Sequence, residues 1–220
     1  MKAIVLVSGG LDSCVTAALA KLDGFVLAFL HMNYGQRTEK RELKSFYDIG
    51  DYYNVKDHLV VDISHLSIIG GSCLTDKNIT VPEANLYNLQ IPVSYVPFRN
   101  ANIMAAAVSW AEVMGVSVIY VGAVEEDSSG YPDCRRSFFD VFEEVIKVGT
   151  KPETNISIKT PLINLSKSEI IKRGMELDAP LDLTWSCYKW EDVPCGECDS
   201  CALRERGFQQ AGISDPLGPS

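Results

Sequence analysis

The sequence lacks the signals that mark membrane, exported and repetitive proteins. It contains no run of eighteen apolar residues, so we expect no membrane-spanning helix. Before Ser8 there are one lysine and about six apolar residues, fewer than a signal peptide needs, so we expect a cytoplasmic protein. Internal repeats and low-complexity tracts are also missing, which argues against repeat architectures.

Positive charge is scarce as well. Lysine and arginine total 20 against 29 aspartates and glutamates, which gives a formal net charge of −9. Surfaces that bind nucleic acid normally carry a basic face, so we expect no nucleic-acid partner, although a local basic pocket remains compatible with this balance. A length of 220 residues and a hydrophobic content of 46% fit a single globular domain with a small appendage.

Two common nucleotide-binding motifs are absent, and a third kind of loop is present. The chain has neither the Walker A string nor the Gly-x-Gly-x-x-Gly fingerprint, and it shows no Ser/His/Asp hydrolase arrangement. Instead, Ser8-Gly-Gly-Leu-Asp-Ser13 follows the apolar run 3–7 and precedes a segment with helical periodicity. A buried strand, two glycines and a helix N-terminus in this order predict a phosphate-binding loop, because free N–H groups and the helix dipole attract an anion.

The segment after the loop has the pattern of an amphipathic helix. Its apolar residues recur at steps of three and four: Leu11, Cys14, Val15, Ala18, Leu19 and Leu22. Gly24 follows the last of them, as expected at a helix C-terminus. A plain glycine turn is the alternative, but such a turn does not need three polar side chains, Ser8, Asp12 and Ser13, around its glycines.

Strand-like and helix-like segments alternate along the rest of the chain. We expect further strands at 25–30, 59–63 and 116–121, an irregular stretch at 66–94, and further helices at 37–53, 103–114, 138–145, 168–177 and 200–210. Ser166 and Glu169 form a capping-box pattern before the helix at 168–177. This alternation predicts an α/β fold with a doubly wound, mostly parallel sheet covered on both faces. Because ligands bind beyond the carboxyl ends of such strands, the Ser8 loop, His31 and Gly122 are expected at one edge.

Four cysteines near the C-terminus form a metal-binding pattern. Cys187, Cys195, Cys198 and Cys201 have the spacing C-x7-C-x2-C-x2-C, and seven cysteines without an export signal indicate a reducing compartment. Four thiolates at these spacings favour a tetrahedral, structural zinc site; an iron–sulfur cluster and unligated thiols are the alternatives. We therefore predict an α/β domain over residues 1–180 and a zinc-binding region over 181–220 packed on it.

Several strings, taken together, resemble one protein family. They are Ser8-Gly-Gly-Leu-Asp-Ser13, Tyr34-Gly-Gln-Arg37, Val96-Pro-Phe-Arg-Asn100, Ser129-Gly-Tyr-Pro-Asp-Cys-Arg135 and Leu183-Thr-Trp-Ser-Cys187 with the three later cysteines. The first string resembles the signature of the N-type ATP pyrophosphatases. The last two narrow the resemblance to the QueC family of queuosine biosynthesis, and it runs from Ala3 to about Pro216.

The resemblance implies an ATP-dependent ligase. Members of the QueC family convert 7-carboxy-7-deazaguanine and ammonia into 7-cyano-7-deazaguanine and release AMP and pyrophosphate. They bind one zinc per chain and are usually homodimers. The loop and the start of its helix would hold ATP with magnesium. The corresponding nucleotide-binding positions are Val7, Ser8, Gly9, Gly10, Leu11, Asp12, Ser13, Cys14, Val15 and His31.

The resemblance also implies catalytic roles for single residues. We expect Asp12, Ser13 and Arg99 to be catalytic, with Asp12 holding magnesium directly or through water. Arg99 or Arg135 offers a fork of donors for the substrate carboxylate and the α-phosphate. His31 has two interpretations, because it either lines the adenine pocket or is a structural histidine with satisfied hydrogen bonds.

The substrate-binding residues are expected in the fourth string. Tyr131 would stack on the base, and Arg135 would contact the carboxylate. A guanine-like edge presents N–H donors that a carboxylate accepts, which favours Asp133 and, as the second choice, Asp127. An ordinary surface turn is the alternative interpretation of this string.

Two departures from the family leave the acceptor open. Thr38 stands where family members often carry histidine, and residues 125–128 are more acidic than is common. One alternative is therefore a QueC-like enzyme that transfers the activated deazapurine acid to another amine. A tRNA-modifying pyrophosphatase, an amidating ligase for GMP or NAD, and a non-enzymatic nucleotide-binding module are further alternatives.

Overall fold

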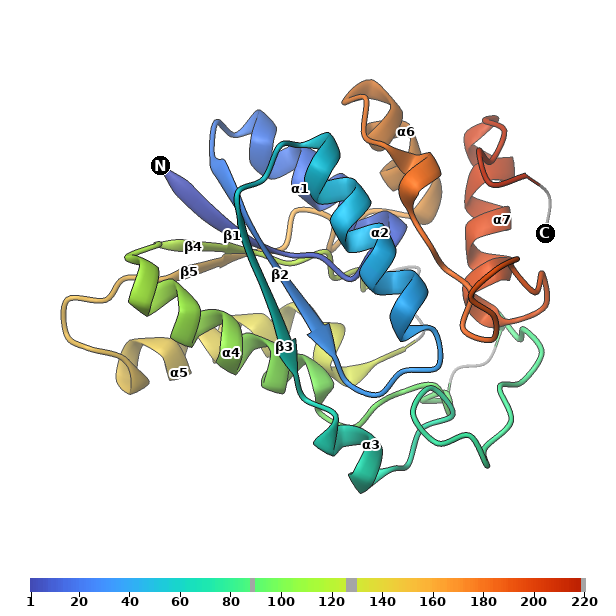
Figure 1. Ribbon diagram of the computed structural model, residues 1–220, viewed down its shortest axis with the longest axis horizontal. Helices are drawn as coiled ribbons and strands as arrows, with labels where there is room; N and C mark the ends of the chain where they lie inside the picture. The colour runs from blue at the N-terminus through green and yellow to red at the C-terminus, as the bar shows by residue number, and fades with distance from the viewer. Residues whose placement is uncertain (88–89, 126–129, 219–220) are drawn as a thin grey trace.

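The sheet of this protein is parallel throughout. The computed structural model describes residues 1–87, 90–125 and 130–218. Its strands are ordered β3-β2-β1-β4-β5, with each strand parallel to its neighbours (Figure 1). They are β1 (Lys2–Leu6), β2 (Val26–Asn33), β3 (Asp57–Asp62), β4 (Val118–Tyr120) and β5 (Ser157–Lys159). Parallel neighbours need crossover connections, which the helices supply.

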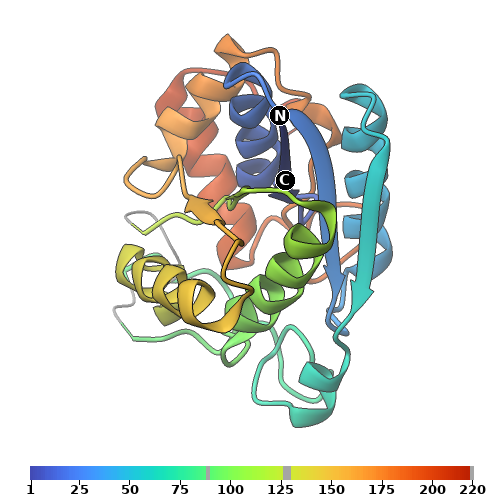
Figure 2. The ribbon, with the colours of Figure 1, turned by 90° about the vertical axis from the view of Figure 1, so that its left-hand side faces the viewer.

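Helices cover both faces of the sheet, as Figures 1 and 2 show. On one face lie α1 (Leu11–Leu22), α2 (Glu39–Tyr52) and α6 (Lys167–Glu176), and α7 (Asp199–Ala211) packs against α6. On the other face lie α4 (Arg99–Met114) and α5 (Arg136–Gly149). The short α3 (His65–Ile69) follows β3, and two 3₁₀ turns cover Pro132–Cys134 and Leu181–Leu183. The predicted α/β, doubly wound fold is confirmed.

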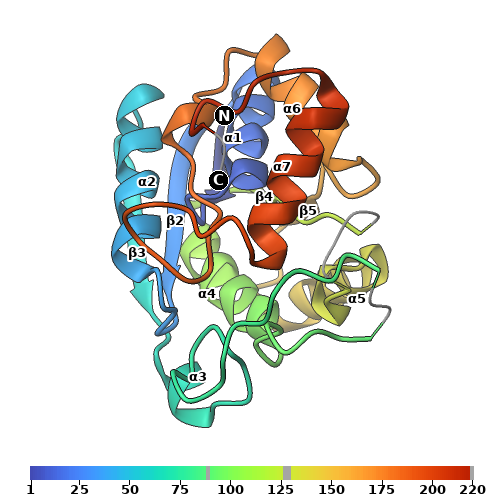
Figure 3. The ribbon, with the colours of Figure 1, turned by 90° about the vertical axis from the view of Figure 1, so that its right-hand side faces the viewer.

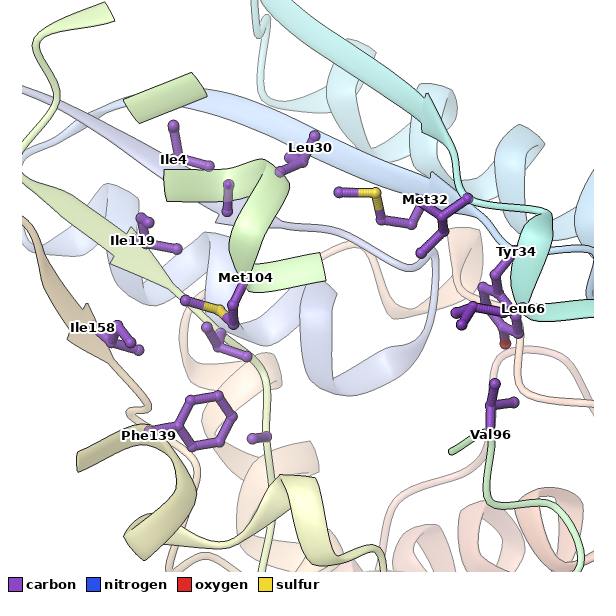
Figure 4. Packing of buried hydrophobic residues seen from close by; sticks show 14 of the residues in the cluster. Ile4, Leu30, Met32, Tyr34, Leu66, Val96, Met104, Ile119, Phe139 and Ile158 are labelled. Atoms are coloured by element: carbon purple, nitrogen blue, oxygen red, sulfur yellow. The ribbon is translucent and has the colours of Figure 1, made fainter. Parts of the chain in front are cut away.

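Alternation along β1 separates two hydrophobic clusters. Ala3 and Val5 point to the cluster that contains α1 and α2, whereas Ile4 points to the cluster beneath α4 and α5. Figure 4 shows Ile4 and Leu30 of the sheet beside Met104, with Phe139 below. Ala3, Ile4 and Val5, the three middle residues of β1, are fully buried, which is the pattern expected of a central parallel strand.

The structure shifts several of the expected boundaries. β2 continues to Asn33, so His31 lies inside this strand and not after it, as the sequence interpretation had it. α4 begins at Arg99, four residues before the expected start, with Phe98 in the left-handed region at φ 56° as its N-cap. β5 was not predicted, because only three residues pair with β4. The capping box of Ser166 and Glu169 is confirmed at the start of α6.

The chain reverses its winding direction between β1 and β4. Ligands of doubly wound sheets bind in the crevice outside this switch point. Gly122, just after β4, packs against the first turn of α1, where a Cβ would lie 3.0 Å from the carbonyl carbon of Asp12. A glycine at this position therefore lets the chain after β4 pack closely on the first turn of α1. Among the described residues, no helix combines the length and apolar character required to cross a bilayer.

Candidate active site

A cavity of about 310 Å³ opens at the switch point. Nine of the expected site residues line it: Val7, Ser8, Gly10, Leu11, Asp12, Ser13, His31, Arg99 and Tyr131. They come from the loop after β1, from the first turn of α1, from β2, from the start of α4 and from the segment before α5. Elements far apart in the sequence thus build one site.

The phosphate loop is held in place by its own hydroxyls and by a distant backbone contact. The Ser13 hydroxyl donates to the Gly10 carbonyl at 2.9 Å, and the Gly10 N–H donates to Ser8 Oγ at 3.2 Å. Gly9 has φ +87°, and a Cβ there would lie 2.5 Å from the carbonyl oxygen of Glu42. The N–H of Trp185 donates to the Gly9 carbonyl at 2.9 Å. The loop therefore reaches the N-terminus of α1 in a fixed shape that suits an anion.

Asp12 forms an ion pair that the sequence interpretation did not include. The Nζ atom of Lys167, on the first residue of α6, lies 2.6 Å and 2.7 Å from the two carboxylate oxygens of Asp12. Both side chains are mostly shielded from solvent and both line the cavity. A phosphate entering beside the loop would meet this lysine as well as the backbone N–H groups.

Arg99 presents a buried guanidinium to the cavity. Its Nη1 donates to the hydroxyl of Tyr34 at 3.2 Å, and its carbon Cζ lies 5.1 Å and 6.0 Å from the ring centroids of Tyr34 and Tyr131. Within the described part of the chain, Arg99 forms no ion pair and its buried Nε has no hydrogen-bond partner. A buried cation without a counter-ion favours the binding of an anionic group at this point.

Glu42 is a carboxylate of the cavity that the sequence analysis missed. It accepts hydrogen bonds from the Thr38 hydroxyl at 2.6 Å and from Nε2 of Gln36 at 3.1 Å. Burial raises its pKa to about 7, although these two donors and the charge of Arg99 act in the opposite direction.

His31 is buried and lines the cavity from β2. Its Nδ1 donates to the carbonyl of Val7 at 2.8 Å, since a carbonyl oxygen only accepts. Burial lowers the pKa of this histidine, so the neutral ring is favoured. Both earlier interpretations therefore have support: the side chain has a structural hydrogen bond and also faces the candidate nucleotide site.

Some expected site residues do not line the cavity. Cys14 and Val15 are buried in the core beneath α1, and Gly9 supports the loop from outside the lining. Asp133 is buried away from the cavity, where its Oδ2 accepts the backbone N–H of Asn100 at 2.9 Å. Arg135 is exposed and lies outside the lining too. Asp127 lies outside the described residues.

The four cysteines come together in a cluster that could hold a metal ion. The Sγ atoms of Cys187, Cys195, Cys198 and Cys201 all lie within 4.8 Å of one another, and those of Cys195 and Cys201 are 3.9 Å apart. A tetrahedral zinc with Zn–S bonds of about 2.3 Å needs sulfurs about 3.8 Å apart, so the cluster fits zinc. The Sγ of Cys187 also accepts backbone N–H bonds from residues 189, 190 and 195, which orient it.

Other residues that line the cavity were not predicted to be functional. They include Tyr34, Glu42, Lys167, Trp185 and Tyr188. Tyr34 and Trp185 belong to two of the strings that carry the family resemblance, and their position there could have indicated a functional role. Lys167 stands 155 positions from its partner Asp12, and no local pattern reveals such a pairing.

Comparisons with known proteins agree with this geometry. Residues 2–212 match the family described as "Queuosine biosynthesis protein QueC". Two similar relatives are named 7-cyano-7-deazaguanine synthase, from Chloroherpeton thalassium and Chlorobaculum parvum. Each is 59% identical over 217 residues, which cover 99% of this chain and 96% of the relative. A solved 4-thiouridine synthetase–RNA complex with bound ATP has a TM-score of 0.53 at 16% identity, over 96% of this chain and 50% of that chain, and this likeness shows the fold alone. The chain therefore belongs to the QueC family of queuosine biosynthesis proteins.

Proposed function

We propose that this chain is a C–N bond-forming ligase that converts 7-carboxy-7-deazaguanine and ammonia into 7-cyano-7-deazaguanine, with release of AMP and pyrophosphate. The observation that carries the proposal is a single cavity lined both by the predicted phosphate loop and by Arg99, which is partly buried and forms no ion pair within the described residues. Relatives of nearly the same length that bear the synthase name support it. The substrates are small molecules, and the formal net charge of −9 argues against nucleic acid as a partner.

The loop binds the two outer phosphates of ATP. The N–H groups at the start of α1 and the hydroxyls of Ser8 and Ser13 face the anion, and Lys167 adds a positive charge. Magnesium, when bound, offsets phosphate charge, and Asp12 is the carboxylate at the loop that would hold it. Asp12 is paired with Lys167, so a bound magnesium would compete with the lysine for this carboxylate, and the lysine would then be available to the phosphates.

Arg99 holds the carboxylate of the substrate near the α-phosphate. Its planar fork suits a carboxylate, and Tyr34 and Tyr131 keep the guanidinium in place. The carboxylate oxygen attacks the α-phosphate, and pyrophosphate leaves into the loop. Ammonia then displaces AMP to give the amide, and a second adenylation followed by loss of AMP gives the nitrile. Positioning and charge stabilisation supply most of the catalysis in this scheme.

The remaining assignments concern the organisation of the protein. We propose an ATP pyrophosphatase domain over residues 1–180 and a zinc-binding region over 181–220, supported by the packing of α7 on α6. A homodimer in the cytoplasm follows from the family resemblance and from the reduced cysteines. Light scattering after gel filtration tests the dimer: it should give twice the monomer mass.

The proposed reaction is tested by incubation with ATP, magnesium, ammonium and 7-carboxy-7-deazaguanine, followed by mass spectrometry. The nitrile should appear together with AMP, and AMP release should depend on the acid.

Asp12→Asn should lower AMP release by at least about 100-fold. The variant lacks the carboxylate that would hold magnesium, so the charge of the phosphates is no longer balanced. Asp48→Asn, which removes an exposed partner of Lys44 on α2, is the matched control and should retain activity. ADP with orthophosphate would contradict the proposal, and AMP without the nitrile would favour transfer to another amine.

A further inference from the structure

Glu42 has no role in the mechanism described so far, yet it is one of the residues that line the cavity. It lies in the first turn of α2, and its own carbonyl oxygen packs against Gly9 of the phosphate loop. Tyr34, which contacts Arg99, lies just before this helix and lines the same cavity. Glu42 is therefore close both to the loop that receives pyrophosphate and to the arginine that holds the substrate.

Two neutral donors fix the orientation of the Glu42 carboxylate. Thr38 donates to Oε1 at 2.6 Å, and Gln36 donates to Oε2 at 3.1 Å. Gln36 is itself held, because its Oε1 accepts the backbone N–H of Tyr34 at 2.9 Å. A carboxylate has about four acceptor sites, so each oxygen keeps capacity for a further donor. The carboxylate is thus preorganised to accept a proton from a molecule in the cavity.

The negative charge of Glu42 is not balanced by an ion pair. Across residues 1–87, 90–125 and 130–218, no lysine, arginine or histidine forms a salt bridge with it. The charged and titratable groups that act on it are Arg99 from α4, Glu39 on its own helix and Tyr34 from the preceding loop. Burial raises the pKa of Glu42 to about 7, which places it near the operating pH, as an efficient general base requires.

We propose that Glu42 is the catalytic base that binds the ammonium ion and takes one of its protons before the amide forms. This inference rests on the proposed function. Ammonium is a small cation with several donors, which suits a fixed carboxylate whose two oxygens keep free acceptor capacity.

The step balances in atoms and electrons. One N–H bond of ammonium breaks, its electron pair stays on nitrogen, and the proton forms an O–H bond on Glu42. The nitrogen lone pair then attacks the acyl carbon of the adenylate, and the C–O bond to AMP breaks with its electron pair on AMP. A second proton leaves the nitrogen for water as the neutral amide forms. Glu42 returns its proton to water and is ready for the next cycle.

The test uses Glu42→Gln in the full-length protein, with two separate measurements. The first is the exchange of labelled pyrophosphate into ATP that depends on 7-carboxy-7-deazaguanine, without ammonium. The second is single-turnover formation of the amide from ammonium. The variant should keep exchange within about threefold of wild type and should lose at least about 100-fold in amide formation, the contribution typical of a general base.

A second nucleophile separates a chemical role from a structural one. Hydroxylamine is uncharged at neutral pH and needs no base to release its lone pair, so Glu42→Gln should form the hydroxamate at nearly the wild-type rate. Glu39→Gln is the matched control: it removes a neighbouring carboxylate of the same helix that does not line the cavity, and it should retain amide formation.

The pH profile gives a further readout. Because the Thr38 hydroxyl lowers the pKa of Glu42, Thr38→Val should move the acid limb of amide formation to higher pH. Because Glu39 raises that pKa, Glu39→Gln should move the limb to lower pH.

The possible failures are distinguishable. Unchanged amide formation in Glu42→Gln would overturn the inference. Loss of pyrophosphate exchange together with loss of amide formation would also overturn it, and would assign Glu42 to binding of the deazaguanine ring. If wild type itself shows no exchange that depends on the acid, the proposed function fails instead.

Discussion

At the scale of single residues, the cavity contains charges that the fold leaves uncompensated. Arg99 has no carboxylate partner and Glu42 has no cationic partner among the described residues. Placing charges in a partly dry site costs stability unless a ligand completes them. Such residues are expected where binding or catalysis takes place, and both of them line the same cavity.

Glu42 should make the stability of the protein depend on pH. Its pKa is about 7 in the folded state, whereas an unfolded glutamate titrates near 4.3. Between these values the folded state binds more protons, so the free energy of unfolding falls as pH rises through this window. The loss amounts to about 3 kcal/mol. When the pH is raised from about 4.5 to about 8, the free energy of unfolding of Glu42→Gln should therefore rise by about 3 kcal/mol relative to that of wild type. Urea unfolding measures this difference.

The same measurement on Glu39→Gln provides the control. Glu39 is partly exposed and does not line the cavity, so its removal should change the pH dependence by no more than about 0.5 kcal/mol. If Glu42→Gln and wild type lose stability in parallel, Glu42 titrates normally and is not desolvated as the structure indicates.

At the scale of elements, α4 depends on a residue far along the chain. Its N-cap, Phe98, supplies no side-chain hydrogen bond, and the first free N–H groups need a partner. Asp133, in the 3₁₀ turn before α5, accepts the N–H of Asn100, and the Asn100 amide donates to the Asp133 carbonyl at 2.8 Å. This pair of contacts fixes the start of α4 and therefore the position of Arg99.

Asp133→Ala should lower the free energy of unfolding by about 1–2 kcal/mol, because a helix loses its cap. It should also lower AMP release, since Arg99 is no longer held. Asp133→Asn keeps an acceptor oxygen and should retain most of both properties, which chemical denaturation and AMP release would measure. If Asp133→Asn had full stability but bound the deazaguanine acid much more weakly, Asp133 would instead contact the deazaguanine ring, as the sequence predicts.

The elements also show what sequence can and cannot predict here. Local signals were sufficient for the glycine loop, for the capping box at Ser166 and for the spacing of the four cysteines, because each depends on neighbouring residues. The role of Asp133 as a cap and the pairing of Lys167 with Asp12 depend on contacts across 33 and 155 positions. The three-residue β5 carries too little pattern to be separated from a loop.

At the scale of the whole molecule, the four-cysteine cluster is joined to the glycine loop at residues 8–13. Trp185, two residues before the first cysteine ligand, donates its N–H to Gly9, and Arg41 of α2 stacks on its ring at 4.6 Å. The segment 66–87 reaches the same region, where the N–H of Ala84 donates to the carbonyl of Glu197 at 2.8 Å (Figure 3). A zinc ion at the cysteines would therefore hold the cavity wall at 185–188 as well as the C-terminal helix α7.

Removal of one ligand should test this connection. Cys198→Ser should lower bound zinc well below one per chain and reduce stability by several kcal/mol, because metal binding is part of the folding free energy. AMP release should fall as well, since Trp185, Ser186 and Tyr188 beside the cluster line the cavity.

Cys73→Ala is the control, because it removes a buried cysteine outside the cluster, and this variant should keep its zinc. Elemental analysis and thermal unfolding measure both effects. A Cys198→Ser protein with full zinc content and unchanged stability would remove this residue from the ligand set, and one that lost zinc but kept full activity would separate the metal from the active-site wall.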